Sequence, residues 1–161
     1  MPEERTPARY ESAAMRNETA AAIIERLGLE RHPEGGWFRE TWRAEAAPGE
    51  RASGTAIHFL LAEGERSHWH RVDTAELWLW HAGAPLQLSL APGEDGPVTH
   101  HVTGPDVLAG HRPQVLVPPH HWQAAAPQRG WTLVSCVCSP AFEFAGFELA
   151  AEGWEPVSPA R

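Results

Sequence analysis

The sequence predicts an all-β protein, a sandwich or a barrel, with one short helix near the amino terminus. Short runs rich in β-branched, aromatic and leucine residues recur at a spacing of about ten residues, and clusters of Gly and Pro separate them. In the run PLQLSLA, three leucines alternate with polar Gln87 and Ser89, which is the pattern of a half-buried strand. Many short strands at regular spacing are typical of sandwiches and barrels.

The one helix is expected over residues 18–27. Asn17 is a suitable N-cap, and Gly28 closes the segment as a C-terminal cap. Between them, four apolar residues follow the i, i+3, i+4, i+7 spacing of one helix face, namely Ala20, Ile23, Ile24 and Leu27. We expect this face to lie against the sheet.

The chain is expected to form a single cytoplasmic domain. Its 161 residues suffice for one hydrophobic core. Residues 1–16 mix Pro, Arg and Glu without an apolar period and predict a flexible tail, which leaves residues 17–161 as the domain. The amino terminus has no apolar signal-peptide region, and no apolar run approaches the roughly 20 residues that a membrane-spanning helix needs.

Composition excludes several classes of function. The net charge is −8, and all 13 basic residues are arginines, so lysine Schiff-base chemistry and a P-loop lysine are both absent. The basic residues form no continuous stripe, so we expect neither nucleic acid nor membrane as a partner. Eight tryptophans favour a small-molecule pocket, because indole rings make flat walls for ligands.

The segment from Gly64 to Gly83 carries the residues best suited to chemistry. His68 and His70 are two apart, so on a regular strand both imidazoles point the same way, and Glu76 follows across a turn. Two imidazoles and a carboxylate on one surface can hold a divalent metal such as Zn, Ni, Mn or Fe. The same groups can instead transfer protons, with His70 as the base and Glu76 as its partner or as the acid.

Two other short motifs favour a structural role. Cys136 and Cys138 are two apart, so alternation places both on one face of a strand, where buried core thiols are expected more often than a metal or redox pair. Gly35 and Gly36 could allow the backbone to approach a ligand closely, but a turn into the first strand is the favoured interpretation.

The Gly64 to Gly83 segment resembles the first motif of the cupin superfamily, G…H-x-H…E…G. A counterpart of the second motif, P-x-G-x-x-H, runs from Pro118 to Gln123; here His120 replaces the glycine, and Gln123 replaces the last histidine. The resemblance implies a double-stranded β-helix, the cupin jelly-roll barrel. It also implies one site at the barrel mouth, and this site groups the four candidate metal ligands His68, His70, Glu76 and Gln123.

Five ordered motifs within residues 27–150 are similar to those of the fifth cupin family, a domain of unknown function with an HPEGG signature. They are HPEGGWFRET, TAIHFLL, HRVDTAELWLWHAG, VPPHHWQ and SCVCSPAFEFAGFEL. In that family, the positions of His70 and Glu76 are regular features, whereas the position of His68 varies. The resemblance implies a homodimer and supplies no established reaction.

Several further residues are candidates for substrate contact. Trp78 and Trp80 share the strand parity of Glu76, so they either line the cavity or pack in the core. Glu40 either faces the cavity as a second carboxylate or forms a surface ion pair. Arg39 or Arg71 could meet an anionic group. The full set of expected substrate contacts is His68, Gln123, Trp78, Trp80, Glu40 and His58.

These features together favour a cupin-fold enzyme for a small molecule. Its chemistry would be acid–base, as in an isomerase, an epimerase or a lyase, on a sugar-like or keto-acid metabolite. One alternative is a metal-dependent enzyme, an oxygenase or a metal-assisted isomerase. The other is a non-catalytic module that binds a small ligand in the same pocket.

Overall fold

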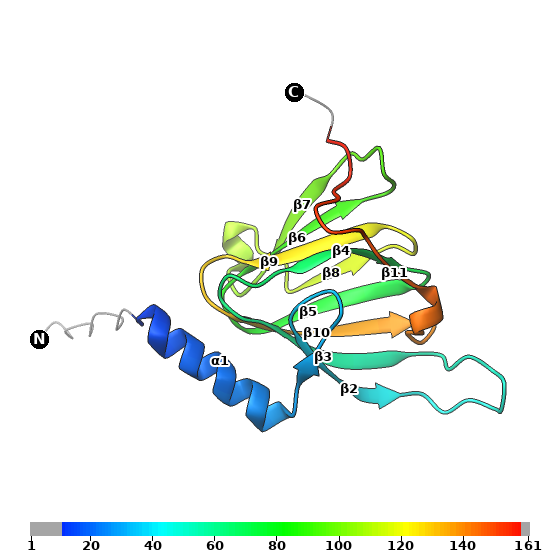
Figure 1. Cartoon of the computed structure of the whole chain (residues 1–161), viewed down its shortest axis with the longest axis horizontal. Coiled ribbons are helices and arrows are strands. Elements are labelled where there is room, and N and C mark those ends of the chain that lie inside the picture. Colours follow the sequence, from blue (N-terminus) through cyan, green and yellow to red (C-terminus); the bar gives the residue numbers. More distant parts are fainter. Residues whose placement is uncertain (1–10, 159–161) are drawn as a thin grey trace, which may run out of the picture.

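The protein folds into two antiparallel β-sheets and one helix, which Figure 1 shows at the edge of the sheets. The computed structural model describes residues 11–158. One sheet has the order β1 (Glu30–Arg31), β2 (Trp37–Arg43), β3 (Thr55–Leu61), β10 (Thr132–Ser139), β5 (Ala75–Gly83) and β8 (Gln114–Val117). The other has the order β11 (Phe147–Leu149), β4 (Ser67–Val72), β9 (Trp122–Pro127), β6 (Leu86–Ala91) and β7 (Thr99–Thr103). Two short 3-10 helices, η1 (Val107–Ala109) and η2 (Phe144–Gly146), complete the described elements.

The hydrophobic core lies between the two sheets. Phe59 and Trp78 from the first sheet belong to the same buried cluster as Leu86 and Leu88 from the second. The alternation of PLQLSLA is present in β6, where the leucines are buried and Gln87 and Ser89 are half-buried. The predicted all-β jelly roll is therefore confirmed.

Helix α1 (Ala13–Leu27) begins five residues earlier than predicted. Its N-cap is Ser12, whose hydroxyl accepts a hydrogen bond from a backbone N–H of the first turn at 3.2 Å, so Asn17 lies within the helix. The sequence contained two possible caps, and the earlier one is used. The residues from Ala13 to Arg16, expected in the tail, are therefore helical. Residues 1–10 of that tail lie outside the described residues. The C-terminal cap at Gly28 is as predicted, with φ 63°.

The helix covers one end of the first sheet on its outer face. Ala20 is buried against Leu29 and Leu60, and Ile23, Ile24 and Leu27 pack on this cluster. Leu60 is fully buried even though its neighbours in β3 point into the main core, because the helix shields that outer position. Within the described part of the chain, no helix is long and apolar enough to cross a membrane.

Candidate functional site

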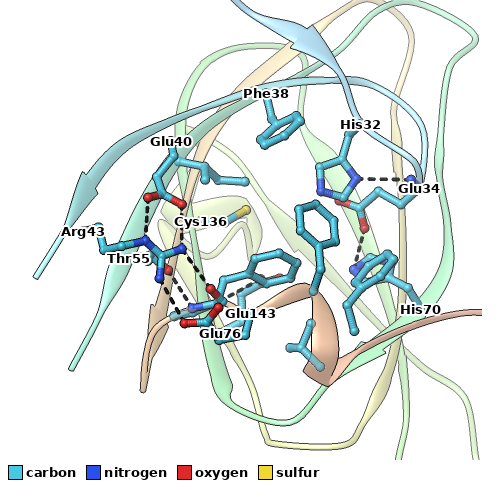
Figure 2. A pocket seen from close by; sticks show the side chains of 16 residues that line it. His32, Glu34, Phe38, Glu40, Arg43, Thr55, His70, Glu76, Cys136 and Glu143 are labelled. Atoms are coloured by element: carbon cyan, nitrogen blue, oxygen red, sulfur yellow. Dashed lines mark hydrogen bonds and ion pairs between the residues drawn. The ribbon is translucent and has the colours of Figure 1, made fainter. Parts of the chain in front are cut away.

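A cavity of about 90 Å³ opens among side chains contributed by both sheets and by the segment around η2. Figure 2 shows His32, Glu34 and His70 on one side of it, and Arg43 with Glu40 and Glu143 on the other. The remaining lining residues are Phe38, Thr55, Ile57, Val72, Glu76, Cys136, Cys138, Phe142, Phe144 and Phe147. The volume is enough for a few water molecules or for a small organic ligand.

His70 and Glu34 form a buried ion pair. His70 Nε2 lies 2.6 Å from Glu34 Oε2, and the two side chains are only 3% and 6% exposed. The other ring nitrogen, Nδ1, lies 2.8 Å from the backbone carbonyl oxygen of His68, which can only accept a hydrogen bond. Nδ1 therefore carries a proton. The short approach of Nε2 to the carboxylate is then that of a protonated imidazole to its counter-ion.

The electrostatics of this pair favour an imidazolium beside a carboxylate. Burial by itself lowers the pKa of His70, but the charge and the hydrogen bond of Glu34 outweigh this effect, so the pKa is raised. Burial likewise disfavours the charged form of Glu34, and the opposing charge of His70 lowers the pKa of the carboxyl below its ordinary value. Each group thus keeps the other ionised.

His32 completes the cluster as a neutral imidazole. Its Nδ1 accepts a hydrogen bond from the backbone N–H of Glu34 at 3.1 Å and lies 3.5 Å from Glu34 Oε1. Burial lowers the pKa of His32 despite the nearby carboxylate. The ring meets Phe38 edge-on, with centroids 4.6 Å apart. Glu34 therefore lies between one charged and one neutral imidazole.

A glycine turn holds Glu34 in this place. Gly35 has φ 109°, and a Cβ at this position would come within 2.2 Å of the carbonyl oxygen of Arg66. Gly36 also has a positive φ, of 76°, and the chain then enters β2. The predicted turn is thus present, and its close backbone approach is to Arg66, just before β4. The His68 N–H donates to the Glu34 carbonyl at 2.8 Å and ties this turn to the strand that carries His70.

Glu76 contributes a second buried carboxyl with the opposite tendency. Burial raises the pKa of Glu76, and His70 offsets this only in part. The Cys138 thiol donates to Glu76 Oε2 at 3.1 Å. Two carboxyls of one cavity thus have pKa values shifted in opposite directions, upwards for Glu76 and downwards for Glu34. Such divergence between neighbouring carboxyls is how proteins separate a general acid from a base.

The two cysteines are free, buried and on one face of β10, as their spacing predicts. Burial raises the pKa of both Cys136 and Cys138, and the nearby charge of Glu76 adds to the effect. Both thiols therefore stay protonated and unreactive at neutral pH. Their role at the cavity is to fill space and, for Cys138, to orient Glu76.

An ion-pair network closes the opposite side of the cavity. Arg43 donates to both carboxylate oxygens of Glu40, at 2.8 and 3.0 Å. It also donates to Glu143 Oε1 at 3.2 Å and to the Phe142 carbonyl at 3.0 Å. The two alternatives for Glu40 are thus both present, because it lines the cavity and forms an ion pair.

The apolar wall is made of phenylalanines, not of tryptophans. Phe38 comes from β2, and the other rings come from the segment around η2, namely Phe142, Phe144 and Phe147. Trp78 is 1% exposed and belongs to the core beneath the cavity, with its Nε1 donating to Gln123 Oε1 at 2.8 Å. Trp80 Nε1 donates instead to the backbone carbonyl of Ala84. Neither indole lines the cavity.

His68 is not placed beside His70, because β4 is not a regular strand. Its pairing with β9 shifts between Ser67 and His70, and this bulge buries both of these residues, which are three apart. His68 therefore points away, and its Nε2 lies 2.9 Å from the Ala151 carbonyl oxygen. The even spacing of the two histidines predicted one shared face, and the bulge removes it.

Two further candidates also lie outside the cavity lining. Gln123 is fully buried, and its Oε1 accepts a hydrogen bond from Trp78. His58 pairs in register with Arg39 and Ser135 within the first sheet. Of the eight predicted site residues, the structure therefore brings His70, Glu76 and Glu40 to one cavity. The other five do not line this cavity, namely His68, Gln123, Trp78, Trp80 and His58.

Sequence reasoning missed His32 and Glu34 as site residues. Both belong to the HPEGG signature, which indicates the family but was not expected to contribute to the site. The signal was available, because a histidine and a glutamate beside two glycines place titratable groups on a fixed turn. What the sequence alone could not show is that this turn packs against His70.

The residues present do not fit the metal site considered above. The four expected ligands do not converge, since His68 points away and the Gln123 oxygen is held by Trp78. Both nitrogens of His70 are already engaged, by Glu34 and by the carbonyl of His68. Among the described residues, no group of three or more His, Cys, Asp or Glu side chains is arranged to hold a metal ion.

Comparison with known proteins places this site in a family context. Residues 21–150 match the family described as cupin superfamily (DUF985). A protein of Shewanella oneidensis, known from its crystal structure, is 41% identical, with a TM-score of 0.77 over 82% of this chain and 84% of its own. A hypothetical protein from Leishmania major is 32% identical, with a TM-score of 0.72 over 80% of this chain and 85% of its own.

More distant structures share the fold alone. An oxalate decarboxylase of Bacillus subtilis is 14% identical, with a TM-score of 0.56 over 74% of this chain and 29% of its own. No curated protein matches the sequence.

Proposed function

Because the chain belongs to the DUF985 family of the cupin superfamily, whose fold is shared by enzymes, we propose that it is a small-molecule enzyme of the acid–base type. The reaction would be an isomerisation, an epimerisation or a lyase cleavage of a small carbonyl compound. One observation carries the proposal: the buried ion pair of His70 and Glu34 lines the same cavity as Glu76, a buried carboxyl whose pKa is raised.

The pair and the acid divide the proton transfers between them. The Glu34 carboxylate, held ionised by His70, accepts a proton from the carbon next to the substrate carbonyl. Glu76 donates its proton to the carbonyl oxygen, so an enediol forms without a net change of charge on the substrate. Glu34 then returns its proton to the neighbouring carbon, and Glu76 takes a proton from the oxygen. These two transfers regenerate both groups. His70 acts as a positioning residue in this scheme, because Glu34 occupies its Nε2.

The surroundings suit such a reaction. Glu34 and Glu76 are each only 7% exposed, and phenyl rings line the same cavity. A dry site strengthens the interactions that stabilise a developing enediolate. The small cavity restricts the substrate to a few heavy atoms, which agrees with a sugar-like or keto-acid metabolite. The homodimer expected from the sequence stays a prediction.

Deuterium incorporation tests the proposal without knowledge of the natural substrate. Full-length protein is incubated in D₂O with dihydroxyacetone, glyceraldehyde or pyruvate, and proton NMR follows the C–H groups next to the carbonyl. We expect enzyme-dependent exchange with at least one compound. Glu34→Gln should slow it by about 10²- to 10⁴-fold, the usual range for loss of a general base.

The matched control is His68→Ala, which removes the neighbouring histidine that faces away from the cavity. This variant should keep the wild-type exchange rate. Exchange no faster than in buffer with all three compounds would reject the acid–base enzyme, and saturable binding without exchange would favour a ligand-binding module instead.

A further inference from the structure

We propose that the cavity binds small molecules that are uncharged or positively charged and discriminates against carboxylates and phosphates. This inference rests on the proposed function for the location of the site, and it narrows the substrate class to neutral carbonyl compounds such as small sugars. Keto acids would then be poor substrates.

Negative charges outnumber positive charges among the residues that line the cavity. Even with Glu76 neutral, three carboxylates remain, those of Glu34, Glu40 and Glu143. Two cations face them, His70 and Arg43. His32 adds no charge, because burial keeps its imidazole neutral. An anionic ligand would therefore enter a space that already carries one uncompensated negative charge.

Arg43 is largely engaged by partners within the protein. It is the only arginine among the described residues that line the cavity, and its Nε, Nη1 and Nη2 donate to Glu40, Glu143 and the Phe142 carbonyl. A substrate carboxylate could form a pair of hydrogen bonds with the guanidinium only by displacing one of these acceptors. A displaced glutamate would then lose its partner.

The two arginines expected to meet an anionic group are elsewhere. Arg71 pairs with Glu148 at 2.7 Å, and its guanidinium stacks over the Trp122 ring at 4.6 Å. Arg39 lies beside Gly28, at the end of the helix. Neither of them lines the cavity.

The apolar wall favours the same class of ligand. The faces of aromatic rings carry partial negative charge and attract cations, so Phe144 and Phe147 tolerate a cation and add nothing for an anion. Anion recognition in proteins instead uses free arginines or exposed backbone N–H groups.

Three nearly isosteric probes separate charge from shape, namely acetate, acetamide and acetamidinium. Full-length protein with ¹⁵N-labelled histidine is titrated with each probe, and NMR follows the ring signals of His32 and His70. We expect acetamidinium and acetamide to shift these signals at concentrations at least about ten times lower than acetate does, a difference of about 1.4 kcal/mol in binding.

A variant at the mouth tests the physical reason. Glu143→Gln removes one partner of Arg43 and one negative charge, so acetate should bind several-fold tighter than in the wild type and acetamidinium weaker. Glu148→Gln removes a carboxylate that pairs with Arg71 outside the cavity, and it should leave the order of the three probes unchanged.

Acetate binding as tight as that of acetamidinium, or no shift with any of the probes, would overturn the inference. The measurement needs no turnover, so it is separate from the fate of the proposed reaction. Charge discrimination in a protein that fails the deuterium test would reject the catalysis and keep the ligand class. Deuterium exchange on pyruvate, together with tight acetate binding, would support the catalysis and reject the proposed ligand class.

Discussion

Replacing His70 with alanine should lower the free energy of unfolding by about 3–5 kcal/mol near pH 6, the usual result of leaving a buried charge without its partner. Glu34 would then be a buried carboxylate, 6% exposed, whose nearest cation is gone. His68→Ala should cost less than about 1 kcal/mol, because it removes a single hydrogen bond at a half-buried position. Denaturant unfolding of the two variants provides the comparison.

The difference between the wild type and His70→Ala should depend on pH. Because the pKa of His70 is raised in the folded state, its contribution is complete below 6.5 and is lost as pH rises through the folded value. Because the pKa of Glu34 is lowered, its contribution is complete above 4.5 and is lost as pH falls through the folded value. The stabilisation should therefore be greatest between pH 4.5 and 6.5. Equal costs for the two histidine variants, or a difference that does not vary with pH, would show that no such pair exists.

Glu76→Gln should slow the proposed exchange reaction by about 10²- to 10⁴-fold while leaving the protein as stable as the wild type or more so. Burial raises the pKa of Glu76, so the wild type loses stability as pH rises from 4.5 through the folded value. Glutamine has the same shape and no charge, and its amide oxygen can still accept from the Cys138 thiol. The stability advantage of the variant should consequently grow with pH.

Thermal unfolding at several pH values measures this second effect, with Glu25→Gln as the control. Glu25 is exposed on α1, so its replacement should change the midpoint little. A Glu76→Gln protein that is less stable than the wild type at alkaline pH would mean that Glu76 is held as a carboxylate. It could not then be the acid of the reaction.

The fold was predictable because its signals are local. The alternation in β6, the cap at Gly28 and the shared face of the two cysteines all follow from a period of two or from a single turn. The family motifs added the arrangement of the sheets. His70 and Glu76 were also predicted to share one cavity, because both belong to the segment that resembles the first cupin motif, and both line the cavity.

The remainder of the site depends on contacts between segments that are distant in sequence. A bulge in β4 decides that His70 faces the cavity and His68 does not, and its cause is the pairing with β9, more than 50 residues later. Three of the four phenylalanines of the wall come from the segment after β10, and the fourth comes from β2. Glu34 becomes a site residue only because the glycine turn packs on the strand that carries His70.

The central claim is that the cavity holds a charged His70 beside an ionised Glu34. It is tested most directly by ¹⁵N NMR of the His70 ring as a function of pH. The account predicts protons on both ring nitrogens at pH 6.5, a titration midpoint above that of free histidine, and a lower midpoint in Glu34→Gln. A His70 ring that is neutral at this pH, with a midpoint below that of free histidine, would contradict the account.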